Sequence, residues 1–156
     1  MRVLMLHNDY TQIGGEHFSV RAEYDFLRKS GVTAHLTTVS AADFATQGGT
    51  PRVLFETITS HSSRRTVTES LDLFRPDIVH VQNLFPLLGS GAIDAIASRN
   101  LPWVRTLRNY RLRCIAGTCF RDGAQCHDCE AASTALPGLL HRCYRGSLPA
   151  SAAAVG

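Results

Sequence analysis

Near the amino terminus, residues 2–7 read RVLMLH, and this stretch decides the fold. Four apolar residues follow one another without a polar break, which predicts a buried strand over Arg2–His7. A second apolar stretch, IVHV, follows the break at Pro76-Asp77 and predicts another buried strand over Ile78–Val81. Both strands end in polar residues, so the chemistry of the chain is expected just after them.

Helical patterns separate the expected strands. The first helix is predicted over Glu16–Ser30, with Phe18, Ala22 and Phe26 on one face together with Leu27. The remaining elements are expected as a strand over Val32–Val39, a helical region over Val53–Phe74, a helix over Gly89–Arg99 and a strand over Trp103–Leu107.

This alternation predicts an α/β fold, a Rossmann-like, doubly wound parallel sheet. Ligands of such sheets bind beyond the carboxyl ends of the strands. The candidate site segments are therefore His7–Gly15, Gln82–Gly89 and Arg108–Cys114. His7, at the end of the first strand, is a candidate ligand-binding residue. The alternative, for both His7 and His80, is a histidine in the core or at its rim whose hydrogen bonds are all made within the protein.

Length and composition limit the class of protein. The chain has 156 residues, the size of one domain, with 44% hydrophobic and 19% charged residues, which is typical of a globular protein. No apolar run approaches the roughly 18 residues of a membrane span, and the start has no signal-peptide pattern. These observations predict a cytoplasmic protein.

The net charge of +3 is unevenly distributed. Residues 1–100 hold nine basic and ten acidic side chains, whereas residues 101–156 hold seven arginines and three acids. Arg105, Arg108, Arg111 and Arg113 follow one another with no acid between them. Such a patch suits phosphates or other anions, and a solvated surface is the alternative interpretation.

Two glycines, Gly14 and Gly15, precede the first predicted helix. They would let a ligand approach the backbone closely, and the helix N-terminus would offer N–H groups to a phosphate. The pattern differs from the G-x-G-x-x-G dinucleotide fingerprint, which argues against NAD. A plain tight turn is the alternative.

Five cysteines lie within thirty residues, in a segment without clear periodicity over about 108–146. Cys126 and Cys129 form a C-x-x-C pair, and with Cys114 and Cys143 they could make a tetrahedral structural zinc site. His127 and His141 are alternative ligands, and Cys119 is left over. Free structural thiols remain the alternative to a metal.

Several segments together carry a family resemblance. They are His7-Asn8 with Gly14-Gly15-Glu16, PDIVHVQN at 76–83 with Phe85-Pro86, TLRNYRL at 106–112, RDG at 121–123 with Cys126 and Cys129, and HRCYRGS at 141–147. Over nearly the whole chain, the sequence resembles the N-terminal domain of family-4 glycosyltransferases of the GT-B fold.

The resemblance implies one half of a retaining, two-domain enzyme. It implies an acceptor-side domain over 1–156 with a cysteine-rich insertion at about 108–146, and the C-terminal donor domain is absent from these residues. The expected activity is that of a hexosyltransferase, as part of a longer protein, with this fragment inactive alone.

The resemblance also assigns residues to a donor and acceptor cleft. Gly14 and Gly15 would lie near the donor diphosphate, with Asn83, Phe85 and Asn109 along the same cleft. Many members have histidines where this sequence has Arg108 and Gln82. No cofactor is required for catalysis, so a bound zinc would be structural.

The expected partners are a nucleotide-sugar donor and a glycan or lipid-linked acceptor of the cell envelope or an exopolysaccharide. A basic face could meet the inner face of the cell membrane peripherally, and nucleic acid is not expected. The alternative functions are a zinc-stabilised binding module and a nucleotide-binding Rossmann domain of another class.

Overall fold

A computed structural model describes residues 1–9, 14–40 and 61–155 of the chain. The chain divides into two compact units, Met1–Thr106 and Leu107–Gly156.

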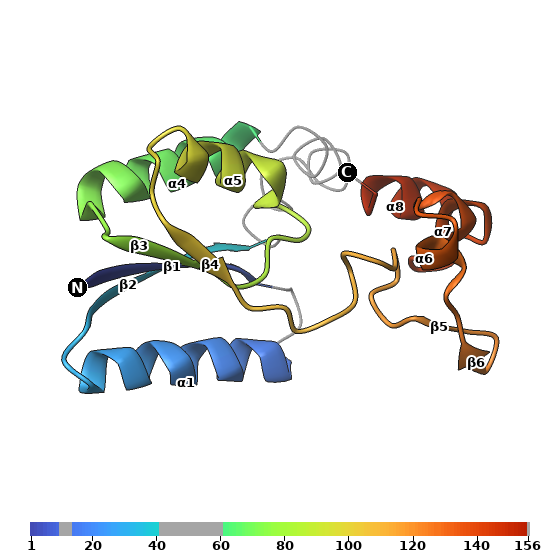
Figure 1. Cartoon of the computed structure of the whole chain (residues 1–156), viewed down its shortest axis with the longest axis horizontal. Helices are drawn as coiled ribbons and strands as arrows, with labels where there is room; N and C mark the ends of the chain where they lie inside the picture. The colour runs from blue at the N-terminus through green and yellow to red at the C-terminus, as the bar shows by residue number, and fades with distance from the viewer. Residues whose placement is uncertain (10–13, 41–60, 156) are drawn as a thin grey trace. The chain divides into compact units, whose positions relative to one another are not determined.

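The first unit is built on a four-stranded parallel sheet with the strand order β2-β1-β3-β4 (Figure 1). The strands are β1 (Arg2–Asp9), β2 (Thr33–Ser40), β3 (Ile78–Val81) and β4 (Trp103–Arg105). All three pairings are parallel, and β1 pairs with β2 over eight residues, from Arg2 opposite Thr33 to Asp9 opposite Ser40. The predicted α/β class and parallel sheet are therefore confirmed.

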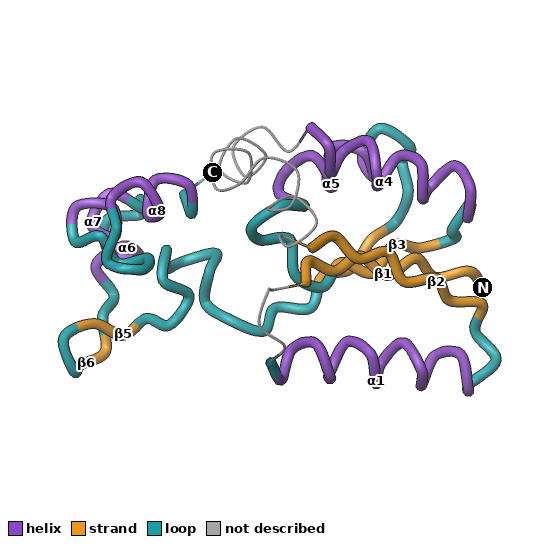
Figure 2. The backbone as a smooth tube through the Cα atoms, turned by 180° about the vertical axis from the view of Figure 1, so that it is seen from behind, coloured by secondary structure: helices purple, strands orange, loops and turns teal. Residues whose placement is uncertain are grey.

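Helices cover both faces of this sheet. On one face lies α1 (Gly15–Lys29), and on the other lie α4 (His61–Phe74) and α5 (Gly89–Ala97), as Figures 1 and 2 both show. The predicted strands and helices of the first unit are present, with boundaries shifted by up to two residues at most ends. The predicted helix over 53–60 lies outside the described residues.

The apolar run of β1 supplies side chains to two cores because alternate residues of a strand point to opposite faces. Leu4 and Leu6 pack with the buried residues of β3, α4 and α5, whereas Val3 and Met5 pack with Val20 of α1. All four are at most 5% exposed. A strand covered in this way must be apolar on both sides, which explains the unbroken run of the sequence.

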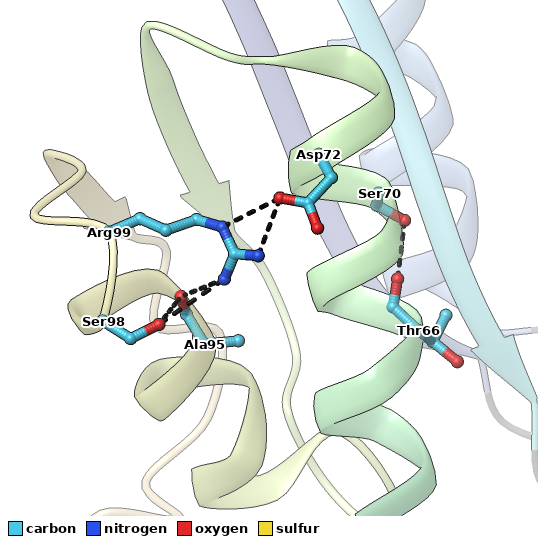
Figure 3. A network of polar contacts seen from close by, with 6 residues as sticks. All are labelled: Thr66, Ser70, Asp72, Ala95, Ser98 and Arg99. Carbon is cyan, nitrogen blue, oxygen red and sulfur yellow. Dashed lines mark hydrogen bonds and ion pairs between the residues drawn. The ribbon is translucent and has the colours of Figure 1, made fainter.

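The helices α4 and α5 bury apolar faces against the sheet. Val67 and Leu71 of α4 are buried, and Phe74 packs against the same core. On α5, Ala92 and Ile96 are buried. A surface network also joins the two helices: Arg99, just after α5, donates from Nη2 to Oδ1 of Asp72 on α4 at 2.7 Å (Figure 3).

The predicted apolar face of α1 is wrong. Phe18 and Phe26 are each 66% exposed, while Val20 is buried and Tyr24 and Leu27 pack against the sheet. Of the predicted face only Leu27 packs against Val3 and Met5, together with Val20 and Tyr24, so the helix is rotated away from the stripe of its phenylalanines.

The second unit consists of short elements. It has an antiparallel hairpin of β5 (Phe120–Arg121) and β6 (Ala124–Gln125), followed by α6 (Asp128–Ala131), α7 (Leu136–Leu140) and α8 (Leu148–Ala153). Within 107–155, Ile115 is the one hydrophobic side chain that the structure shows as buried. Across all the described ranges, no helix combines the length and the apolar character needed to cross a membrane.

We expect α4 to depend on Leu71, which is 2% exposed, far more than on Leu73, which is 87% exposed. Leu71→Ala should lower the free energy of unfolding by about 2–5 kcal/mol, because it leaves a cavity in the core. Leu73→Ala makes the same chemical change on the surface and should stay within about 0.5 kcal/mol of the parent. Urea unfolding followed by the fluorescence of Trp103, the single tryptophan, measures both. Equal losses for the two variants would contradict the assigned core face.

Candidate functional site

Four polar residues are buried where β1 and β3 reach their carboxyl ends. They are His7, Asn8, Gln82 and Asn83, each at most 6% exposed. Main-chain hydrogen bonds continue between the two strands here, from the Gln82 N–H to the Leu6 carbonyl and from the Asn8 N–H to the Asn83 carbonyl, both at 2.9 Å. The strands therefore hold this polar group rigidly at one edge of the sheet.

The two asparagines shape the loop that follows β3. Oδ1 of Asn8 accepts the Leu87 N–H at 2.9 Å, and its Nδ2 donates to the Asp9 carbonyl at 3.2 Å. Asn83 folds onto Phe85 in the same manner: its Oδ1 accepts the Phe85 N–H at 3.1 Å and its Nδ2 donates to the Phe85 carbonyl at 3.0 Å. Two predicted site residues, Asn83 and Phe85, thus lie in one turn, and the Asn83 amide holds that turn.

A shared carboxylate links the end of β1 to the start of α1. Oδ1 of Asp9 lies 3.3 Å from Nε2 of His7 and 3.0 Å from Nδ1 of His17 in the first turn of α1. The side chain of His7 is only 3% exposed, so this predicted site residue is buried beside Asp9. The sequence prediction did not include Asp9 or His17, although Asp9 falls within the predicted segment His7–Gly15.

A second histidine and carboxylate pair joins α1 to β3. The carboxylate of Glu23 lies 3.3 Å from Nδ1 of His80 and accepts a hydrogen bond from Nε2 of Gln82 at 2.9 Å. Nε2 of His80 is 2.8 Å from the hydroxyl of Thr106, just after β4. The face of the sheet beneath α1 is therefore apolar at Val3 and Met5 and polar toward the carboxyl end.

Gly14 and Gly15 stand at the start of α1, as predicted. Gly14 is the N-cap, with extended backbone angles of −125° and −176°, and as a glycine it has no side chain with which to cap the helix. A Cβ atom built on either glycine meets no atom of the described residues within 4 Å. The space beside the two glycines and the positive end of the helix dipole would suit an anion at this end of the helix.

Arg108 and Asn109, the remaining predicted cleft residues, belong to the second unit. Both are exposed, and Oδ1 of Asn109 accepts the Arg111 N–H at 3.0 Å. The structure therefore brings His7, Asn83, Phe85 and the glycine pair into one unit. Arg108 and Asn109 lie in the other unit.

Part of the basic stretch is paired within its own unit. Nη1 of Arg111 donates to the Ile115 carbonyl at 3.0 Å, and its guanidinium lies 5.2 Å from the centre of the Tyr144 ring. Arg113 forms an ion pair with Glu130. These contacts favour a structural role for both arginines, although they also border a cavity of about 490 Å³. In the first unit, burial lowers the pKa of the Arg105 guanidinium.

All five cysteines line one small cavity of about 20 Å³ in the second unit. Burial alone would raise the pKa of the Cys114 thiol, but the backbone N–H groups of residues 116–119 hydrogen-bond to its sulfur and hold the pKa below its ordinary value. Burial, with the neighbouring Cys114 sulfur next, raises the pKa of Cys119. Burial also raises the pKa of Cys143, and Arg121 offsets only part of that effect.

The predicted zinc ligands Cys114, Cys126, Cys129 and Cys143 are therefore brought together, and Cys119 joins them. Among the residues that the structure describes, no three His, Cys, Asp or Glu side chains form a group that could hold a metal ion as they stand. Comparison of the chain with models of known protein families and with curated proteins finds no match.

We expect the buried amide of Asn8 to be important for stability. Asn8→Ala leaves the buried Leu87 N–H without its acceptor and should cost about 1–3 kcal/mol of unfolding free energy. Asn109→Ala removes the same kind of bond at an exposed position, where water replaces it, and should change stability by at most about 0.5 kcal/mol. Urea unfolding followed by circular dichroism compares the two. An equal loss of unfolding free energy for Asn109→Ala would contradict the view that the burial of Asn8 makes its replacement destabilising.

Proposed function

We propose that this chain is the acceptor-binding N-terminal domain of a retaining glycosyltransferase. The enzyme would transfer a hexose from a nucleotide-sugar to a cell-envelope or exopolysaccharide acceptor. In this proposal the first unit is a doubly wound Rossmann-like domain, the cysteine-rich second unit is an excursion from it, and both work within a longer protein that carries a donor domain.

The observation that carries the proposal is the polar group at the carboxyl end of β1 and β3, beside the glycine start of α1. The chain runs from β1 through α1 to β2 on one side, and then returns past β1 to β3 on the other. Such a change of direction between two neighbouring strands is where parallel α/β sheets usually bind their ligands. Two of the segments that carry the resemblance to family-4 glycosyltransferases, His7-Asn8 and PDIVHVQN at 76–83, end at this same edge.

The groups at this edge suit the two chemical parts of the reaction. The first-turn N–H groups beside Gly14 and Gly15 would stabilise the negative charge of the leaving nucleoside diphosphate. Asp9 and His17 have partly buried polar side chains. They could form hydrogen bonds with the hydroxyl groups of the sugar acceptor. The mechanism would be electrostatic, with the acceptor hydroxyl attacking on the retained face and no metal taking part.

Two departures from the family pattern bear on the donor sugar. Gln82 and Arg108 stand where many members have histidines. The side chain of Gln82 already bonds to Glu23 and lies 3.2 Å from Nε2 of His80, so it is committed to the interior of the fold. Arg108 is exposed and cationic, and would serve an anionic group of the donor or of a lipid-linked acceptor.

A lipid-linked acceptor would require contact with a membrane surface. Within the second unit, three large apolar side chains alternate with the arginines of the basic stretch: Leu107, Tyr110 and Leu112, each about 60% exposed. Apolar side chains interleaved with cations are typical of peripheral attachment to anionic lipid. We include such attachment, at the inner face of the cell membrane, in the proposal.

The charge at the start of α1 provides the test. In the chain joined to a family-4 donor domain, Gly15→Glu should lower kcat/KM for the nucleotide-sugar about tenfold relative to Gly15→Gln, which corresponds to about 1.4 kcal/mol. The two side chains have the same shape, so the difference reports repulsion between the carboxylate and the donor diphosphate. Both variants should unfold at the parent's temperature, because a Cβ at this position meets no atom of the described residues within 4 Å.

The isolated chain and the choice of nucleotide are the controls. Without a donor domain, the 156 residues should show no measurable transfer from UDP- or GDP-sugars. Robust turnover by the isolated chain, or equal activity of the Glu and Gln variants, would overturn the proposal. A thermal shift with NAD but with neither UDP- nor GDP-sugars would instead favour a Rossmann domain of another class.

A further inference from the structure

We propose that the second unit holds a structural Zn²⁺ ion, bound by the side chains of Cys114, Cys126, Cys129 and Cys143. The site lies wholly within Leu107–Gly156, and it is independent of the transferase proposal above.

The second unit has a very small hydrophobic core. Of its hydrophobic side chains within 107–155, Ile115 alone is buried in the structure, and several large ones, such as Phe120 and Leu140, are more than half exposed. Its helices have four to six residues, and its hairpin strands have two residues each. A segment of about fifty residues with so small a core usually needs disulfides or a metal for stability.

Its cysteines come from different elements and meet at one place. Cys114 precedes the hairpin, Cys126 directly follows β6, Cys129 lies in α6, and Cys143 follows α7. All of them line the same cavity of about 20 Å³. A metal bound by thiols from four separate segments would join the hairpin, α6 and α7 at one centre. The small hydrophobic core of the unit does not supply such a connection.

The surroundings of the sulfurs suit metal-bound thiolates. The backbone N–H groups of residues 116–119 point at the Cys114 sulfur, and the Arg121 guanidinium hydrogen-bonds to Cys143. Gly138 packs closely against Cys129 and Ile115. A Cβ atom at this position would lie 3.1 Å from the Cys129 sulfur and 2.9 Å from Cδ1 of Ile115. Hydrogen bonds from N–H groups orient metal ligands and offset the negative charge of a four-thiolate site.

Four thiolates indicate zinc among the common divalent ions, in tetrahedral geometry with Zn–S distances of about 2.3 Å. The sulfurs line the cavity but do not yet form a closed ligand group. The inference therefore includes a small inward movement of the loops that carry them. The free energy of metal binding would then contribute directly to the folding of the unit.

Cys119 is the internal control. Its side chain hydrogen-bonds to that of Cys114, and its carbonyl accepts the Cys126 N–H at 2.9 Å across the base of the hairpin. We place it beside the ligand set, as a group that orients Cys114. The chain thus offers a fifth cysteine in the same cavity whose replacement should spare the metal.

The first experiment uses the unmodified chain, purified under reducing conditions without chelator. We expect one zinc per chain by elemental analysis. After replacement by Co²⁺, we expect the intense visible bands of tetrahedral cobalt together with thiolate-to-metal charge transfer. Removal of the metal with a chelator should make 107–156 sensitive to limited proteolysis. Zinc far below one per chain, or bound cobalt without thiolate bands, would overturn the proposal regardless of how any variant folds.

The second experiment assigns the ligands. Cys129→Ser and Cys143→Ser should each lose the tetrathiolate cobalt spectrum, whereas Cys119→Ser should keep both the spectrum and one zinc per chain. The Cys119→Ser variant makes the same chemical change in the same cavity. If Cys119→Ser lost the site while Cys143→Ser retained it, the ligand set named here would be overturned.

Discussion

The burial of β1 on both faces is the constraint on which the first unit depends. Its apolar residues supply two separate cores, and its neighbours β2 and β3 occupy both of its edges. Burial does not stop where the apolar residues end, because His7 and Asn8 continue the same strand. Buried polar groups need partners, and these come from the Leu87 N–H and the Asp9 carboxylate. The candidate site is thus built from the groups that satisfy the polar end of a fully covered strand.

The sequence was most informative where burial was complete. The buried strand at the apolar run of β1 was predicted correctly, since residues enclosed on both sides by other elements must be apolar. The face of α1 was predicted wrongly because its phenylalanines form a regular stripe that is exposed. Part of the face toward the sheet is polar: Glu23 points to His80 and Gln82. A hydrophobic pattern cannot identify a helix face that covers a polar end of the sheet.

The candidate site was predictable in its location and less so in its contacts. Strand ends and the glycine pair indicated, from local sequence alone, the edge of the sheet at which the structure places the buried polar residues. The pairing of Glu23 with Gln82 joins residues 59 apart in the chain, so it depends on the tertiary fold. The cysteine spacing predicted a compact group, and the structure gathers all five around one cavity.

The strand order has a consequence for how the protein behaves in concentrated solution. Within the described sheet, β2 is an edge strand of eight residues, and its sequence TAHLTTVS contains no proline and no Lys, Arg, Asp or Glu. Natural edge strands usually carry such residues, which prevent the main chain of another molecule from pairing with them. Self-association of this chain is therefore expected to begin by strand addition at β2. The net charge of +3 places no charged side chain on this strand that would oppose such pairing.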